Sequence, residues 1–310
     1  MFKFVAARLV NLLGLTGRVA DSFEFWIYDT LKITFIMLIV IFAVSYLRTY
    51  LPPEKIRDFL KGKKAFVGYL LAGLFGIISP FCSCSTIPLF LGFVGAGVPF
   101  GMTITFLFVS PMVNEAAVFV LFGSLGWEIT LAYLLGGISI GIIGGTALTK
   151  LGFERYVIDF EFGDNQSGSE GSTTSAKKRL REAFGDAKDI VGRIFPYVIV
   201  GVGLGAAIHG FLPERFIQGA LQGTLAVPAA TALGIPIYTN IMGVIPVAES
   251  LIGKGLPVGT SIAFMMSVAA LSVPQFVLLK QVMKKNLLIA YGSIIGVGIM
   301  ILGFVFNWIF

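Results

Sequence analysis

The chain has 310 residues, of which 56% are hydrophobic and only 13% are charged, and its mean hydropathy is +0.89. These values exclude an ordinary water-soluble domain and indicate an all-α polytopic membrane protein. The formal net charge of +6 would suggest nucleic acid or another acidic partner if the protein were soluble. Here the basic residues gather beside apolar runs, so we interpret them as topology determinants and expect no nucleic-acid binding.

The first segment, residues 1–27, does not resemble a cleaved signal peptide, because no compact apolar core leads to a small-residue cleavage site. Lys3, Arg8 and Arg18 interrupt its apolar residues. This pattern favours an amphipathic helix that lies in the membrane interface.

Eight apolar runs follow, and several reach the roughly 20 residues that cross a hydrocarbon core of about 30 Å. The runs are 28–47, 65–79, 86–108, 116–149, 190–211, 223–252, 256–279 and 287–310. We divide the chain into a first transmembrane repeat (28–150), a linker (151–189) and a second transmembrane repeat (190–310). The linker contains the polar stretch GDNQSGSEGSTTS, whose composition is typical of a flexible connection.

The basic residues set the expected topology. Six Lys or Arg lie within 48–64, eight within 150–193 and three within 280–285. By the positive-inside rule these clusters, and with them the linker, are cytoplasmic, in a multi-pass protein of the inner (cell) membrane. The same assignment places the three basic residues of the N-terminal segment outside, against the rule, so the sequence leaves the absolute orientation open.

The two halves share a repeat at an offset of 158 residues. PLFLGFVGAGVPFGMTITF (88–106) aligns with PVAESLIGKGLPVGTSIAF (246–264), and both contain a G-x-G-x-P-x-G register. Run 28–47 ends at a basic cluster whereas its counterpart 190–211 begins at one, so equivalent elements run in opposite directions. We therefore predict two inverted repeats, each with about three transmembrane helices and a broken re-entrant hairpin.

Each predicted hairpin has a polar, helix-breaking tip. The first tip is ISPFCSCSTIP (78–88) and the second is GIPIYTNIMGVIP (234–246). Irregular backbone is tolerated at membrane depth only where protein or a water-filled cavity satisfies it, and paired breaks in inverted repeats are typical of a transporter's substrate site. The alternative is that these prolines and glycines only kink packed helices.

The first tip holds both cysteines of the chain, Cys82 and Cys84. Two thiols this close can chelate one soft centre such as As(III), Sb(III), Cu(I) or Zn(II), although a buried cysteine can also pack as a small hydrophobe. Two cysteines and one histidine cannot by themselves close a four-ligand zinc site, and we expect no cofactor. The predicted substrate-binding residues are Cys82, Cys84, Ser83, Ser85, Ser110, Asn114, Thr239 and Asn240.

A second polar group follows in FVSPMVNEAAVF (108–119). Glu115 lies inside an apolar run, where an ionisable side chain is costly and usually functional, so it is our candidate for proton coupling. Pro111 frees a backbone carbonyl nearby, because proline has no N–H. The alternative is a packing hydrogen bond between helices. A comparable but uncharged patch in the second half consists of Ser272, Pro274 and Gln275.

SPFCSCSTIP, followed by GVPFGMTITFLFVSPMVNEAAVF, resembles the ArsP-type predicted permeases, whose studied members export trivalent organoarsenicals. The resemblance covers nearly the whole chain. It implies an efflux permease of arsenic resistance in which Cys82 and Cys84 contact the trivalent arsenic. It implies nothing about the energy source.

Three hypotheses about function remain. They are a secondary transporter with its site between the two tips, a channel or transporter for a metal ion or small anion, and an intramembrane thiol oxidoreductase. The last would normally need a second dithiol, and the chain has none. No G-x-x-x-x-G-K-[ST] pattern appears, so the chain is no ATP-driven pump on its own. We expect that the protein is not an enzyme and that its partners are a small-molecule substrate and the lipid bilayer. The sequence leaves the oligomeric state open.

Overall fold

The computed structural model describes residues 17–48, 65–78, 83–95, 97–158, 225–237, 251–253 and 255–310, and isolated residues elsewhere. Its helices are α2 (Arg18–Arg48), α4 (Ala65–Ile78), α5 (Ser83–Gly95), α6 (Phe100–Met112), α7 (Glu115–Leu125), α8 (Trp127–Lys150), the short 3-10 helix η1 (Phe153–Tyr156), α11 (Ala226–Gly234), α13 (Val258–Ala270), α14 (Val273–Leu279) and α15 (Lys285–Ile309). Within these residues no strand occurs, and one isolated antiparallel bridge joins Val157 to Met283. The all-α expectation is confirmed for this part of the chain.

Among the described helices, α8 and α15 are long and apolar enough to cross a membrane. The pair α6 and α7 counts as a third span if it is taken as one helix, bent by 51° at its junction. Leu135 and Ile143 on α8 and Ile301 on α15 are exposed. A surface of this kind suits contact with lipid, because large apolar patches are rarely left in water. These features are those of a membrane protein.

Glycines divide two of the apolar runs into separate helices. Run 116–149 contains α7 and α8, because Gly126 between them adopts a φ of 88°, which an L side chain rarely adopts. Run 86–108 contains most of α5 and most of α6, which are separated by a turn at Gly97 with a φ of 72°. The helix α2 begins at Arg18, inside the segment that the sequence assigns to the membrane interface. Hydropathy does not detect such divisions, because the residues on both sides are equally apolar.

The helices α4 and α5 are half-length elements of 14 and 13 residues, about 20 Å each at 1.5 Å per residue. Along α4, Gly68 lies against Met102 and Gly76 lies against Ser110, so α4 runs parallel to α6. The ring of Phe93 on α5 contacts Phe106 of α6, with ring centroids 5.3 Å apart. The end of α4, the start of α5 and the end of α6 therefore lie at one level.

The helix bounds recur at the offset of the sequence repeat. The starting residues of α6 and α13, of α7 and α14, and of α8 and α15 are each separated by 158 residues. The turns before α6 and α13 are also alike, since Gly97 and Gly255 have positive φ and donate their N–H groups to Val94 and Ile252 at 2.9 Å. The same sequence register thus produces the same local structure in both halves.

The two long spans α8 and α15 pack against each other in opposite directions. The contacts, in order along α8, are Gly136 with Leu302, Ile140 with Gly298, and Gly144 with Ile294. The partner's number falls as the number along α8 rises, so the helices are antiparallel. Ile140 and Gly298 are equivalent positions in the repeat. The two helices therefore contact each other at the same repeat position, near the middle of each helix. Such a reciprocal contact is what a two-fold axis produces.

A second antiparallel pair joins α2 to described residues between 184 and 203. The indole N–H of Trp26 donates to the carbonyl oxygen of Ile199 at 2.9 Å. The rings of Phe42 and Phe184 meet edge to face, with centroids 6.4 Å apart. Phe184 follows Trp26 by 158 residues and is therefore its equivalent in the second repeat. Phe42, in the later part of α2, thus packs on the equivalent of a residue in the earlier part of α2.

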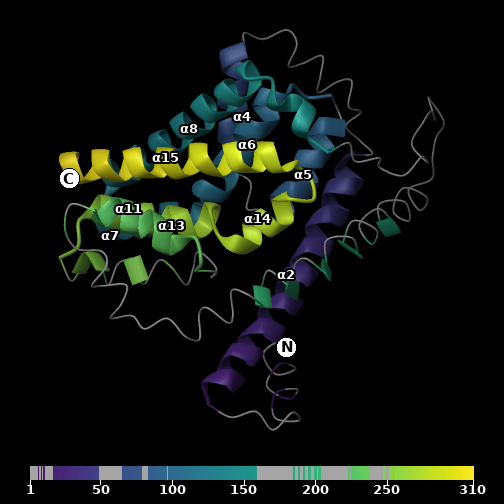
Figure 1. Cartoon of the computed structure of the whole chain (residues 1–310), viewed down its shortest axis with the longest axis horizontal. Coiled ribbons are helices and arrows are strands. Elements are labelled where there is room, and N and C mark those ends of the chain that lie inside the picture. The colour runs from purple at the N-terminus through teal and green to yellow at the C-terminus, as the bar shows by residue number, and fades with distance from the viewer. Residues whose placement is uncertain are drawn as a thin grey trace.

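Figure 1 shows α15 (yellow) beside α11 and α13, with α2 (purple) at the other side of the molecule next to α5, and the helix contacts agree. The segment after α8 returns to the start of α15. There the Lys284 N–H donates to the carbonyl of Tyr156 at 2.8 Å, and that of Ile158 to Val282 at 3.0 Å. The end of α8 and the start of α15, both basic, therefore share one side of the molecule.

We expect Gly145→Leu to destabilise the protein, because this glycine is where α8 touches α6. A Cβ atom at Gly145 would lie 2.7 Å from the carbonyl oxygen of Gly101 and against the Thr105 hydroxyl. Overpacking of this kind costs about 1–3 kcal/mol, measurable as a lower melting temperature in detergent. Gly123→Leu is the matched control, because nothing lies within 4 Å of a Cβ there. Equal melting temperatures for both variants would contradict the described packing.

Candidate functional site

The predicted site residues of the first tip lie at the start of α5. Ser83, Cys84 and Ser85 are the first three residues of this helix. Cys82, Thr239 and Asn240 lie outside the described residues, so the second tip is not described at the predicted positions. The first turn of a helix has backbone N–H groups without intrahelical partners and carries partial positive charge. Cys84 therefore stands where a helix attracts electron-rich groups.

A buried hydrogen bond joins this turn to the end of α6. The hydroxyl oxygens of Thr86 and Ser110 lie 3.0 Å apart, and either can be the donor. Thr86 is fully buried and Ser110 is 2% exposed. Because Thr86 follows Cys84 by two residues, the bond places the cysteine-bearing turn beside the polar stretch 110–115. The structure thus brings together two of the motifs that the sequence singled out.

The polar stretch coincides with a break between two helices. α6 ends at Met112 and α7 begins at Glu115, while Val113 between them is extended, with φ −118° and ψ 100°. Asn114 and Glu115 are both partly buried at this break. Pro111 inside α6 contributes to the early end of the helix, because its ring removes one backbone hydrogen bond.

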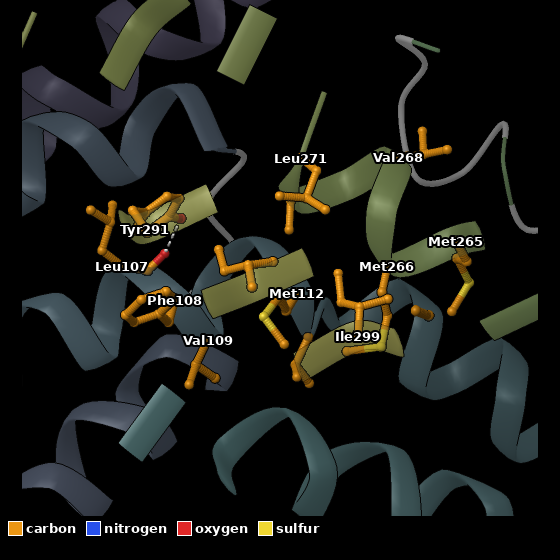
Figure 2. Packing of buried hydrophobic residues seen from close by; sticks show 14 of the residues in the cluster. Leu107, Phe108, Val109, Met112, Met265, Met266, Val268, Leu271, Tyr291 and Ile299 are labelled. Carbon is orange, nitrogen blue, oxygen red and sulfur yellow. Dashed lines mark hydrogen bonds between the residues drawn. The ribbon is translucent and has the colours of Figure 1, made fainter. Parts of the chain in front are cut away.

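Two tyrosines supply hydrogen bonds to carbonyl groups near the break. Pro111 has no N–H, so the carbonyl of Leu107 one turn earlier lacks its usual helical donor; the Tyr291 hydroxyl donates to it at 3.1 Å. Figure 2 shows this bond and the Phe108 ring beside Tyr291, stacked with centroids 4.7 Å apart. The Tyr133 hydroxyl donates to the carbonyl of Met112 at 2.7 Å and lies beside the backbone of Asn114.

The break lies near the middle of the long spans. Val113 contacts Gly137 of α8, one helical turn from the Ile140–Gly298 crossing. In the second half Leu271, between α13 and α14, lies 3.8 Å from a Cβ built on Gly296 of α15. Both breaks are therefore within about one turn of the place where the two halves cross.

The second break has its own buried polar residues. Ser272 precedes α14 and is 4% exposed, and Gln275 within α14 is 1% exposed. The Val273 N–H donates to the carbonyl of Ile235 at 3.1 Å, which ties this break to the end of α11. α14 also packs against α5, so the second break approaches the cysteine-bearing helix.

Sequence reasoning missed several buried polar residues. The sequence analysis did not select Tyr133, Tyr291 or Thr86 as site residues. Asp29 on α2 is 6% exposed and lies inside run 28–47, so the rule that selected Glu115 would also have found it. No group of three or more His, Cys, Asp and Glu that could hold a metal ion occurs in the part of the chain that the structure describes.

Comparisons with known proteins place the chain in a family of predicted permeases. Residues 19–308 match the ArsP_1 family, described as predicted permease. Similar proteins are UPF0718 protein MJ0584 of Methanocaldococcus jannaschii, 20% identical over 81% of this chain and 84% of its own, and UPF0718 protein YcgR of Bacillus subtilis, 21% identical over 84% and 88%. UPF0718 protein YraQ of Escherichia coli is 24% identical over 78% of this chain and 68% of its own. No solved structure matches the fold.

We expect Thr86 and Ser110 to be energetically coupled, because each satisfies the other's hydroxyl in a buried position. A double-mutant cycle with Thr86→Val and Ser110→Ala should give a coupling free energy of about 0.6 kcal/mol and at most about 1.7 kcal/mol, the average and the maximum for hydrogen bonds between membrane helices. Denaturant unfolding in mixed micelles measures it. Thr86→Val combined with Ser139→Ala is the control, because Ser139 is exposed and bonds only within its own helix. Additive effects in both pairs would contradict the docking of α5 on α6.

Proposed function

Because the chain belongs to the ArsP_1 family of predicted permeases, a transporter and not an enzyme is indicated, and we propose that it is a secondary transporter that exports trivalent organoarsenicals or related thiophilic solutes. The proposed site lies between the tips of two re-entrant hairpins, at the middle of the membrane. The observation that carries the proposal is the Thr86–Ser110 hydrogen bond, which holds the cysteine-bearing turn of α5 against a broken helix.

The packing of the two halves supports an inverted repeat. α8 and α15 start at equivalent residues, run antiparallel and meet at equivalent positions, Ile140 and Gly298. Since both helices are long enough to span the membrane, a two-fold axis that exchanges them would lie in the membrane plane. Transporters built from such repeats bind their substrates near the bilayer midplane, at discontinuous helices.

The half-length helices support the re-entrant hairpin. α4 and α5 are each too short to span the hydrocarbon core, and their facing ends lie level with the end of α6. In lipid, irregular backbone persists only where protein or a polar cavity satisfies it. The tyrosine hydroxyls satisfy the carbonyls of Leu107 and Met112, so side chains of the long spans satisfy part of the broken backbone.

The thiols supply the chemistry for arsenic. A monosubstituted arsenical R–As(OH)₂ exchanges one hydroxyl for a thiol: an As–S bond forms, an As–O bond breaks, and the thiol proton leaves with the hydroxyl as water. No oxidant or reductant is needed, so the bonds can form on one side of the membrane and reverse on the other. Cys82 and Cys84 are one residue apart, so both soft ligands can contact one centre. One thiol is bonded to the arsenic at a time, and one hydroxyl stays on it.

Transport in everted vesicles tests the proposal. We expect wild-type protein to accumulate methylarsenite and the double variant Cys82→Ser/Cys84→Ser to lose at least nine-tenths of this uptake, because serine oxygen is a poor ligand for a soft centre. Adding Ser139→Cys to the double variant provides a control with a thiol on an exposed face of α8, and it should not restore uptake. Unchanged uptake in the double variant would remove the thiols from the transport path, and no uptake by the folded wild type would exclude this substrate.

We expect Glu115→Gln to separate coupling from passage of the solute. The carboxyl at the first residue of α7 is the proposed proton carrier, so its loss should abolish uptake driven by a proton gradient while solute exchange at equal concentrations continues. Thr130→Val is a control elsewhere in the same half, since Thr130 bonds only to Gly126 at the start of its own helix. Gradient-driven uptake that survives Glu115→Gln would exclude this carboxyl as the proton carrier. An uptake rate that keeps rising with solute concentration and never saturates would favour a channel.

A further inference from the structure

Gln275 has an unusual environment among the described residues. Its side chain is 1% exposed, yet neither its amide nitrogen nor its amide oxygen has a hydrogen-bond partner. A primary amide offers two donors and an acceptor oxygen, and the large majority of buried polar side-chain atoms are paired. At membrane depth an unpaired amide is especially unfavourable. A residue kept here in spite of this cost calls for a ligand that pairs with it.

The surroundings of Gln275 connect it to the proposed thiol site. Its amide lies close to the Tyr291 hydroxyl, but the two groups do not meet the distance and angle of a hydrogen bond. That hydroxyl already donates its proton to Leu107. Ser110 follows Leu107 by three residues on the same side of α6 and pairs with Thr86 of α5. α14 itself packs against α5. Polar groups from four helices therefore lead from the unpaired amide to the cysteine-bearing turn.

The amide has no counterpart in the first half. Ala117 occupies the equivalent position of the repeat, 158 residues earlier, and is fully buried. A residue needed only to build the repeated fold would be expected in both halves in some polar form. The first break instead carries Asn114 and Glu115, so the two breaks face the midplane with different chemistry.

We propose that Gln275 is a substrate-binding residue that holds a hydroxyl group of the solute while the cysteine-bearing turn of α5 holds its soft atom. The inference rests on the proposed function. When one thiol displaces one hydroxyl of R–As(OH)₂ as water, a second hydroxyl remains on the arsenic. That hydroxyl can donate to the amide oxygen and accept from the amide N–H, which satisfies both atoms. A dialkylated acid R₂As–OH loses its single hydroxyl in the same exchange and offers the amide nothing, so Gln275 selects monosubstituted arsenicals.

The test compares binding of methylarsenite and dimethylarsenite to purified protein, by the rise in melting temperature that each ligand causes and by direct titration. We expect the wild type to bind methylarsenite at least tenfold more tightly than dimethylarsenite. Gln275→Met, which keeps the length of the side chain without its polar atoms, should lose this preference while its affinity for dimethylarsenite changes less than twofold. Gln281→Met is the matched control: this glutamine also has an unpaired amide nitrogen but lies in the turn before α15, and its substitution should leave both affinities unchanged.

The stability of the ligand-free variant separates binding from structure. If the amide is unpaired until solute arrives, Gln275→Met should melt at or above the wild-type temperature, because a buried unsatisfied group has been replaced by an apolar one of similar shape. A lower melting temperature with the methylarsenite preference intact would overturn the inference and make Gln275 a structural residue. An unchanged preference in a stable variant would overturn it as well. If the wild type binds neither arsenical, the proposed function itself fails.

Discussion

A broken helix inside a membrane leaves backbone groups in a medium that offers them no partners, and the described part of this protein is organised around that constraint. Pro111 removes one donor within α6, and the helix ends at Met112. Side chains of the long spans supply replacement donors. The Tyr133 hydroxyl of α8 donates to the Met112 carbonyl, and the Tyr291 hydroxyl of α15 donates to the Leu107 carbonyl. Because both hydroxyls belong to spans that cross at Ile140 and Gly298, these hydrogen bonds fix the break close to that crossing.

Close packing of the spans is the condition for these hydrogen bonds. Gly137, Gly141 and Gly145 lie four residues apart and form the face of α8 against α6, as is common where membrane helices approach closely. Gly298 allows the same close approach of helices where α15 meets α8. Without these glycines the helix axes would separate by a side-chain diameter, and a tyrosine hydroxyl would no longer reach a carbonyl on its neighbour. The small residues and the two tyrosines thus act together.

The sequence predicted local features well and long-range partners poorly. The G-x-G-x-P-x-G register led to matching turns at Gly97 and Gly255, because each requirement for positive φ is local. Pro111 was expected to free a carbonyl, but the donor, Tyr291, lies 184 residues away from Leu107, and no spacing rule identifies it. The division at Gly126 was missed because apolar residues continue on both sides. Asp29 was overlooked although it obeys the rule that selected Glu115. The substrate-binding and proton-coupling roles all stay predictions, and Cys82, Thr239 and Asn240 also lie outside the described residues.

The two halves share a backbone pattern but differ in how their tyrosines are used, and the difference has a simple origin. Proline at position 111 corresponds to Ala269 in the second half, so only α6 exposes a carbonyl one turn before its break in this way. Tyr133 bonds within its own half, whereas Tyr291 bonds across to the other. A rocking of one half against the other would leave the first bond intact and break the second. The bond between Tyr291 and Leu107 therefore favours one arrangement of the halves, and Gln275 lies beside the hydroxyl that such a motion would release. The proposed binding of a solute at this amide and the relative position of the halves would in this way depend on the same few groups.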